Sequence, residues 1–293
     1  MSTLDFEALR ETRAANPGKI AEILANRKRR DLIKGDGKLF IVAADHPARG
    51  ALGVGKNETA MADRYELLER LATALSRPGV DGVLGTPDII EDLALLGLLD
   101  DKIVVGSMNR GGLKGASFEM DDRYTAYDID GIKESGLDFA KNLMRINLKD
   151  AGSVETLETS SLVVNEAAAA QVPIMLEPFM SEWVDGKIVN DLTPDAVILS
   201  IGIAAGIGNS SAYTWLKLPV VEDMERVMAS TTLPTLLLGG DPQGDAEETF
   251  AQWAHALTLP GVRGLVVGRS LLYPADGDVV SAIDTAAALV HGS

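Results

Sequence analysis

Cysteine is absent from this sequence, and its absence removes several kinds of chemistry at once. A disulfide framework, a thiolate zinc site and a cysteine nucleophile all require thiols. Histidine is nearly as scarce, because the chain has only His46, His255 and His291, without HxH or HExxH spacing. We therefore expect no metal site and no bound cofactor.

Positively charged residues are also few in this chain. The chain has 27 Lys and Arg residues against 43 Asp and Glu residues, which gives a formal net charge of −16. A field of this sign repels phosphate backbones and anionic lipid surfaces, so we expect neither nucleic acid nor a membrane as a partner. An anionic small substrate would need a local cluster of arginine, lysine and backbone N–H groups.

A continuous apolar run is missing from residues 1–30, where charged and apolar residues alternate. We expect neither a signal peptide nor a membrane span there, and the expected location is cytoplasmic. Apolar residues such as Phe6, Leu9 and Ile20 recur at helical spacing, and the segment ends in a basic run at residues 27–30. The pattern predicts a helical lead-in over residues 1–37.

Strand-like runs alternate with helical stretches through the rest of the chain. Hydrophobic residues make up 46% and charged residues 24%, which is typical of a globular domain with a sizeable core. Eight short β-rich runs lie at residues 39–44, 82–84, 103–105, 139–145, 174–176, 213–218, 235–238 and 264–267. Helical patterns between them, as at residues 60–76 and 154–170, predict parallel strands with the helices outside.

Eight such units favour a closed barrel over an open sheet. An open doubly wound sheet usually has fewer strands and a glycine fingerprint after the first, and no GxGxxG follows residues 39–44. No composition break, low-complexity linker or repeat marks a second domain. We therefore predict an α/β fold, a single (β/α)8 TIM barrel over residues 38–293 with the helical extension before it. Residues 111–130 are predicted to form a long loop after the third strand.

Polar side chains at the strand ends are the candidates for catalysis, since barrel enzymes place their active sites there. Asp45 ends the first strand, although an aspartate that caps the following loop is an equally good interpretation. Glu177 ends the fifth strand after an apolar run. Lys217 lies within the apolar sixth strand, where a lysine needs a partner or a function. A snorkelling or ion-paired Lys217, with Glu177 as its structural partner, is the alternative interpretation.

The functional interpretation makes Lys217 a nucleophile that attacks a carbonyl to form an iminium. A desolvated site with a cationic neighbour favours the neutral amine that this reaction needs. Glu177, on the adjacent strand, could move protons during the reaction. The fourth strand adds Lys141 and Arg145 at i and i+4, which point to one side of a strand, although one of the two could instead face a helix or solvent.

Glycine pairs follow the last two strands, at Gly239-Gly240 and Gly268-Arg269. Barrels often bind phosphate in these two loops, where glycines expose backbone N–H groups and Arg269 can supply a fixed charge. Turn glycines are common, so the position of the two pairs matters more than their presence. Arg110, after the third strand, is a further candidate anion contact, with solvent exposure as the alternative.

These residues together resemble the class I aldolases of the family that groups archaeal-type fructose-bisphosphate, tagatose-bisphosphate and deoxyribose-phosphate aldolases. The resemblance rests on AADHP, FAKNLMR, LEPFM, TWLKLP, the Gly239-Gly240 pair and GVRGLVVGRS. It implies that Lys217 is the Schiff-base lysine and that Gly268-Arg269 is the phosphate turn. Where archaeal fructose-bisphosphate aldolases have a tyrosine, this strand end has Pro178 and Phe179, so the acid/base role stays open between Glu177 and Asp45.

The chain also resembles an actinobacterial group of aldolase-like proteins associated with inositol breakdown. That resemblance implies cleavage of 2-deoxy-5-keto-gluconate 6-phosphate into dihydroxyacetone phosphate and malonate semialdehyde by a homo-oligomeric lyase. Arg145 or Arg110 would suit the carboxylate of this substrate, and would equally suit a second phosphate. A phosphosugar isomerase or epimerase, and a non-catalytic sugar-phosphate sensor, remain as rival functions.

Overall fold

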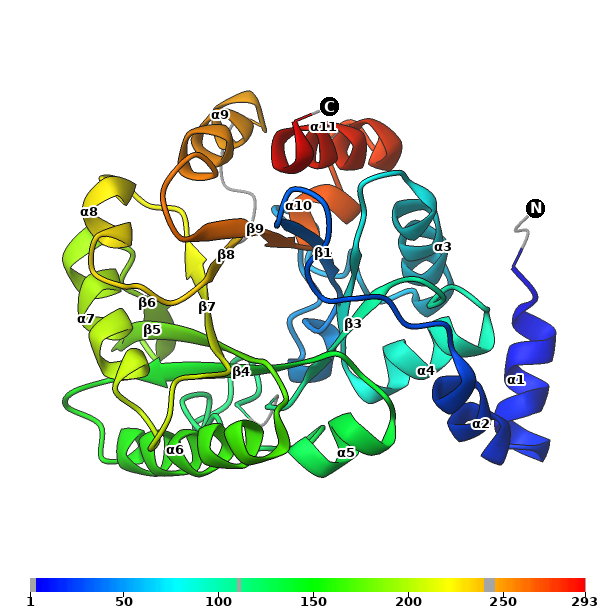
Figure 1. Ribbon diagram of the computed structural model, residues 1–293, viewed down its shortest axis with the longest axis horizontal. Helices are drawn as coiled ribbons and strands as arrows, with labels where there is room; N and C mark the ends of the chain where they lie inside the picture. The colour runs from blue at the N-terminus through cyan, green and yellow to red at the C-terminus, as the bar shows by residue number, and fades with distance from the viewer. Residues whose placement is uncertain (1–3, 110–111, 240–245, 293) are drawn as a thin grey trace.

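Eight parallel strands close into a barrel, and helices surround it (Figure 1). The computed structural model describes residues 4–109, 112–239 and 246–292. The barrel strands are β1 (Leu39–Ala43), β2 (Gly82–Gly85), β3 (Ile103–Ser107), β4 (Phe139–Ile146), β5 (Ile174–Val184), β7 (Thr214–Pro219), β8 (Thr235–Leu238) and β9 (Val262–Val267). They pair in the order β4-β3-β2-β1-β9-β8-β7-β5, and the β4–β5 pairing closes the ring. The predicted (β/α)8 barrel is confirmed.

One hairpin was not predicted. Strand β5 continues past the barrel wall and pairs antiparallel with β6 (Lys187–Asn190). The turn between them is Asp185-Gly186, and both residues have positive φ, 49° and 73°. Tight two-residue hairpin turns require this backbone geometry, which Asp-Gly adopts readily. The pair of residues was therefore a usable signal for the hairpin.

Several helices begin at a side-chain cap, usually an aspartate. Their bounds are α1 (Phe6–Ala15), α2 (Gly18–Asn26), η1 (Pro47–Arg49), α3 (Arg64–Ser76), α4 (Pro87–Leu95), α5 (Ile129–Glu134), α6 (Gly152–Ala170), α7 (Pro194–Ala205), α8 (Met224–Met228), α9 (Ala246–Ala256), α10 (Arg269–Leu272) and α11 (Val279–His291). Helix α3 begins four residues after the predicted start because Asp63 caps it and accepts hydrogen bonds from two backbone N–H groups. Within the described ranges, no helix is both long and apolar enough to cross a membrane.

The core has two layers because alternate residues of each strand face opposite sides. In β1, Leu39 and Ile41 belong to the cluster inside the barrel, whereas Phe40 and Val42 pack against the helices. Every residue of β1 is buried. This alternation decides which polar side chains enter the barrel.

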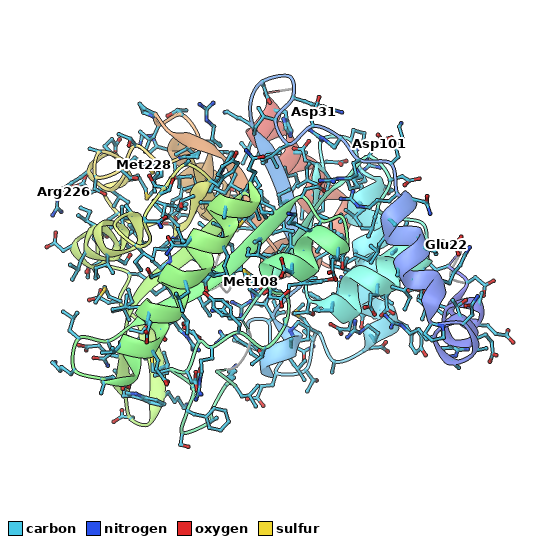
Figure 2. The ribbon with its side chains drawn as sticks, turned by 60° about the horizontal axis from the view of Figure 1, so that its bottom comes forward. Glu22, Asp31, Asp101, Met108, Arg226 and Met228 are labelled. Carbon is cyan, nitrogen blue, oxygen red and sulfur yellow. The ribbon has the colours of Figure 1, made fainter. Side chains whose placement is uncertain are left out.

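The N-terminal lead-in folds as two helices rather than one. The chain breaks between α1 and α2 at Asn16-Pro17, because the residue before a proline is driven out of the helical region. The basic run then docks below the barrel, where Arg27 donates to Asp138 at 2.6 Å and to the carbonyl of Gly136 at 2.7 Å. Figure 2 shows Glu22 of α2 on the outer surface and Asp101 near the segment that follows this helix.

Candidate active site

Three strands place ionisable side chains inside the barrel. Lys141 stands on β4, Glu177 on β5 and Lys217 on β7, each two positions after an apolar residue of the inner core, namely Phe139, Met175 and Trp215. The alternation along a strand therefore points all three into the lumen. Their exposed fractions are only 0%, 7% and 4%. Buried charges of this kind need partners.

The three groups are partners for one another. Oε1 of Glu177 lies 2.6 Å from Nζ of Lys217, and Oε2 lies 2.5 Å from Nζ of Lys141. Lys141 also lies 3.4 Å from Oδ2 of Asp45, which follows β1 and is fully buried. Ser107 donates its hydroxyl to the same Asp45 oxygen at 3.0 Å. Two acids and two amines thus form one continuous cluster.

Glu177 is ionised in this cluster. Burial by itself would raise the pKa of the carboxyl, but the charges of Lys141 and then Lys217 outweigh burial and hold the pKa well below its usual value. The carboxylate therefore carries a full negative charge between two amines. In this state it is an acceptor for a proton that leaves either amine.

A cavity of about 580 Å³ opens at the carboxyl ends of the strands. Its lining includes Lys217, Glu177, Gly239, Gly268 and Arg269, but neither Asp45 nor Lys141. A ligand in this cavity would touch the first five, whereas the last two lie behind them. A larger hollow of about 730 Å³ near α8 and α9 has no lysine or arginine among its described lining residues, so it suits an anion less well.

The turn after β9, where the sequence predicts phosphate binding, lies close to the barrel wall. A Cβ atom on Gly268 would lie 2.0 Å from the carbonyl oxygen of Ala43, so only glycine fits there. The close approach of the Gly268 backbone to Ala43 brings the start of α10, and with it Arg269, next to the end of β1. Gly240 and Arg110, two further predicted anion contacts, lie outside the described residues.

His46 also lines the cavity, although the sequence reasoning did not select it as a site residue. Burial and the nearby positive charges of Arg269, Lys217 and Arg49 hold the pKa of His46 well below its usual value. Its Nδ1 lies 3.8 Å from Oδ1 of Asp45, beyond hydrogen-bond distance. The ring is therefore neutral at pH 7. Its place directly after Asp45, at a strand end, was the signal that could have identified it.

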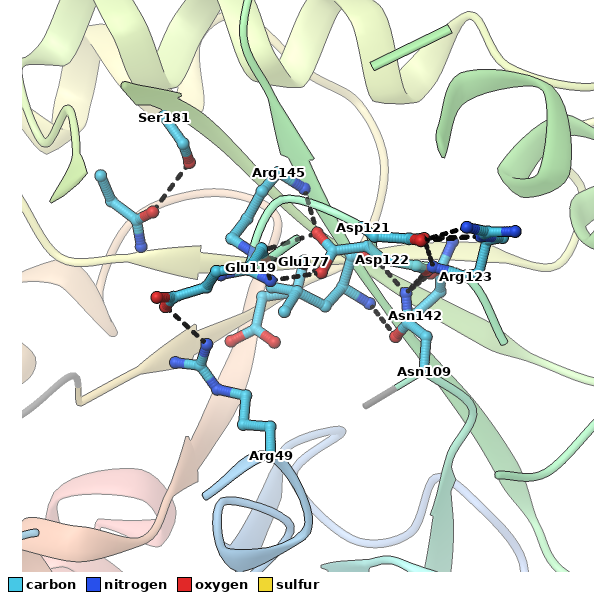
Figure 3. Close-up of polar contacts among 12 residues, drawn as sticks. Arg49, Asn109, Glu119, Asp121, Asp122, Arg123, Asn142, Arg145, Glu177 and Ser181 are labelled. Atoms are coloured by element: carbon cyan, nitrogen blue, oxygen red, sulfur yellow. Dashed lines mark hydrogen bonds and ion pairs between the residues drawn. The ribbon is translucent and has the colours of Figure 1, made fainter. Parts of the chain in front are cut away.

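Arg145 faces the cavity but is matched by an internal carboxylate (Figure 3). Its Nη2 lies 2.6 Å from Oδ1 of Asp122, and its Nε lies 3.1 Å from Oδ2. It also donates to the backbone carbonyl of Glu119. Both acidic residues belong to the stretch 112–128, which has no helix or strand and covers most of the predicted loop 111–130. Arg145 is 2% exposed.

Arg49, which the sequence reasoning also missed, completes this group. It comes from η1, lines the cavity, and has its Nη1 3.8 Å from Oε1 of Glu119. The same Glu119 oxygen lies 3.6 Å from Nη1 of Arg145. Figure 3 shows Arg49 and Arg145 approaching Glu119 from different elements. Arg49 stands at the end of the first strand, so the strand-end rule that selected Asp45 would also have found it.

Metal ligands do not gather in the same way. Over residues 4–109, 112–239 and 246–292, no three His, Asp or Glu side chains are placed to hold a metal ion.

Comparisons with solved structures show where this barrel has relatives. The crystal structure of Cgl0159 from Corynebacterium glutamicum matches with a TM-score of 0.96 and 73% identity, covering 98% of this chain and 97% of that one. An archaeal fructose 1,6-bisphosphate aldolase matches with a TM-score of 0.67 and 19% identity, over 94% of this chain and all 100% of its own. A fructose-bisphosphate aldolase from Slackia heliotrinireducens matches with a TM-score of 0.59 and 14% identity, over 100% of this chain and 94% of its own. The two aldolases share the fold.

Sequence comparisons give a narrower result. No curated protein has a significant match to the chain. The family model described as Cgl0159-like matches residues 37–287, which is the barrel without the lead-in helices. The chain therefore belongs to the Cgl0159-like family.

Proposed function

We propose that the chain is a metal-independent class I aldolase that cleaves a phosphorylated ketose or keto sugar acid through a Schiff base on Lys217. One observation carries the proposal. The amine of Lys217 lines the cavity at the strand ends and lies 2.6 Å from a carboxylate that can take its proton. A nucleophile in contact with its base is the arrangement that covalent catalysis requires.

The charges around Lys217 favour attack on a carbonyl. Lys141 and Lys217 share the single carboxylate of Glu177, so a neutral amine at one position relieves repulsion between two ammonium groups. The carbinolamine formed on Lys217 is also neutral. With one positive charge gone, Glu177 binds a proton more readily, and it can then donate that proton to the departing hydroxyl. The resulting iminium is the electron sink for carbon–carbon cleavage, and this sink needs no metal.

The other cluster residues act through Lys141. Asp45 does not line the cavity, and its contacts include Lys141 and the hydroxyl of Ser107. We infer that Asp45 positions Lys141, that Lys141 sets the field at Lys217, and that Glu177 moves the proton at the Lys217 nitrogen. A neutral His46 at the cavity wall is available to the substrate hydroxyl.

The substrate phosphate is assigned to the turns after β8 and β9. Gly239, Gly268 and Arg269 line the cavity there, and Arg269 offers charge-assisted hydrogen bonds to a phosphate. Gly240, the other predicted contact, lies outside the described residues. This assignment places the phosphate on one arc of the barrel mouth and leaves the opposite arc for the rest of the substrate.

For the substrate itself, the proposal is 2-deoxy-5-keto-gluconate 6-phosphate, cleaved to dihydroxyacetone phosphate and malonate semialdehyde. Fructose-bisphosphate, tagatose-bisphosphate and deoxyribose-phosphate cleavage are the alternatives. The solved structures of a similar fold include an archaeal fructose-1,6-bisphosphate aldolase with its catalytic lysine bound to a carbinolamine intermediate, at 19% identity. That likeness supports the reaction class and leaves the substrate open.

Borohydride trapping tests the proposal. The enzyme is incubated with dihydroxyacetone phosphate and with each candidate substrate, reduced, digested and examined by mass spectrometry. We expect a stable secondary amine on the peptide that contains Lys217, and none in the Lys217→Arg variant. Isomerised substrate without an adduct would favour the isomerase, and binding without turnover or adduct would favour the sensor.

A further inference from the structure

We propose that Arg49 is a specificity-determining residue, which binds a carboxylate at the non-phosphate end of the substrate and discriminates against a second phosphate. This inference rests on the proposed aldolase function, because it names the class of substrate that the same cavity accepts. It is carried by the position of Arg49 in the barrel mouth and by the charges around it.

The position of Arg49 in the barrel mouth supports this role. In the closed ring of strands, β4 lies opposite β9, and β3 lies opposite β8. The phosphate turn, with Arg269, follows β9, whereas Arg145 stands on β4 and Glu119 follows β3. Arg49 reaches that second group from η1, and all three line or border one cavity. A substrate held by its phosphate at Arg269 therefore extends across Lys217 towards Arg49.

The hydrogen-bond donors of Arg49 and Arg145 differ in how fully they are used within the protein. Arg145 is held by both oxygens of Asp122 and by the backbone carbonyl of Glu119, so its hydrogen bonds are used within the protein. Arg49 differs, because its buried Nε and Nη1 have no hydrogen-bond partner among the described residues. A guanidinium donates charge-assisted hydrogen bonds to a carboxylate. Arg49 lines the cavity and its charge is less fully matched within the protein than that of Arg145.

The charges around Arg49 favour a carboxylate over a phosphate at this position. The side chains of Arg49 and Arg145 carry two positive charges, and those of Glu119 and Asp122 carry two negative charges, so the group is balanced. A carboxylate beside Arg49 adds one negative charge. A phosphate monoester adds nearly two and places them beside Glu119, whose carboxylate already lies 3.8 Å from Arg49. Glu119 is fixed there, because it accepts a hydrogen bond from the backbone N–H of Gly115 at 2.7 Å.

The aldol addition of dihydroxyacetone phosphate to three aldehydes tests the inference. Malonate semialdehyde ends in a carboxylate, glyceraldehyde 3-phosphate in a phosphate, and glyceraldehyde in a neutral group. We expect the wild-type enzyme to have its highest kcat/KM with malonate semialdehyde. In Arg49→Gln, the KM for malonate semialdehyde should rise about 10- to 100-fold, since hydrogen bonds to charged groups contribute that much, whereas the KM for glyceraldehyde, which has no anionic end, should change far less.

Two further variants make the test sharper. Glu119→Gln removes the repelling charge, so it should raise kcat/KM for glyceraldehyde 3-phosphate relative to malonate semialdehyde. Arg123→Gln is the matched control, because Arg123 belongs to the same loop and pairs with Asp121 at 2.5 Å, outside the cavity lining. This variant should leave kcat and KM for all three aldehydes unchanged.

The outcomes separate this inference from the proposed function. Trapping on Lys217 does not involve Arg49, so an enzyme that forms no adduct with dihydroxyacetone phosphate or with any candidate substrate refutes the aldolase itself. An enzyme that forms the adduct but prefers glyceraldehyde 3-phosphate, accepts none of the three aldehydes, or loses activity equally for all three in Arg49→Gln refutes the role of Arg49 alone.

Discussion

Replacing Glu177 by glutamine should destabilise the fold and slow catalysis at the same time, because one carboxylate serves both lysines. Its two oxygens lie 2.6 Å from Lys217 and 2.5 Å from Lys141. Glutamine keeps the shape but carries no charge, and its N–H₂ group turns a donor towards one of the two ammonium groups. One buried amine therefore loses its partner.

The size of the effect follows from what that amine can do. Breaking a buried ion pair by removing one partner typically costs about 3–5 kcal/mol. Either lysine can limit the cost by releasing its proton, so we expect a loss near the lower limit, about 3 kcal/mol at pH 7. Turnover should fall by roughly 10²- to 10⁴-fold, as is usual when an acid–base group is lost, while some borohydride adduct still forms.

The loss of stability in Glu177→Gln should depend on pH. The folded-state pKa of Glu177 is held below the unfolded value, so the carboxylate stabilises the fold fully above the unfolded pKa of about 4.3. This stabilisation is lost as the pH falls towards the lowered folded-state pKa. The difference in unfolding free energy between wild type and Glu177→Gln should therefore be largest near pH 7 and shrink below about pH 4.

Urea unfolding at several pH values measures this difference. Glu182→Gln is the matched control, since Glu182 belongs to the same strand, is 62% exposed, and lies 3.7 Å from Lys149. An exposed pair of this kind contributes little, so the control should lose less than about 1 kcal/mol. If Glu177→Gln were as stable as the control at pH 7, or if the difference did not change with pH, the assigned charge state of the cluster would be wrong.

The remaining predictions concern separate parts of the molecule. Lys217→Arg keeps a positive charge but cannot form an iminium, so turnover and adduct should vanish while circular dichroism stays unchanged; near-normal turnover would overturn the Schiff-base mechanism. Arg269→Ala should raise the substrate KM about 10- to 100-fold, and an unchanged KM would place the phosphate elsewhere. Incubation with EDTA should leave the rate unaltered, whereas lost activity restored by a metal would favour a metal-dependent reaction. Arg27→Ala removes a buried ion pair of 2.6 Å with Asp138 below the barrel, but Asp138 keeps Arg29 at 2.9 Å, so the loss in urea unfolding should stay below the value of about 3–5 kcal/mol for a fully broken pair, with kcat unchanged.

Local pattern was sufficient to predict the barrel, and it failed where distant residues decide the structure. The eight apolar runs coincide with the eight barrel strands because strands covered on both faces are apolar throughout. The lead-in was predicted as helical, but its break at Pro17 was overlooked although proline is a local signal. The docking of Arg27 on Asp138 joins residues 111 positions apart, and no local pattern contains such a contact.

The candidate site likewise contains residues that the local sequence pattern predicted and a contact that it did not. Lys141, Glu177 and Lys217 were selectable because an ionisable residue within an apolar strand has few structural explanations, and the alternation of side chains then sends all three into one lumen. The partner of Arg145 was not selectable, because Asp122 belongs to a loop whose path depends on the whole barrel mouth. This distinction matters for function. From the sequence, Arg145 is a free cation that suits any anion, whereas in the fold its charge is already matched. Arg49 is therefore a better candidate than Arg145 for the substrate-binding cation, because its Nε and Nη1 have no hydrogen-bond partner within the described part of the chain.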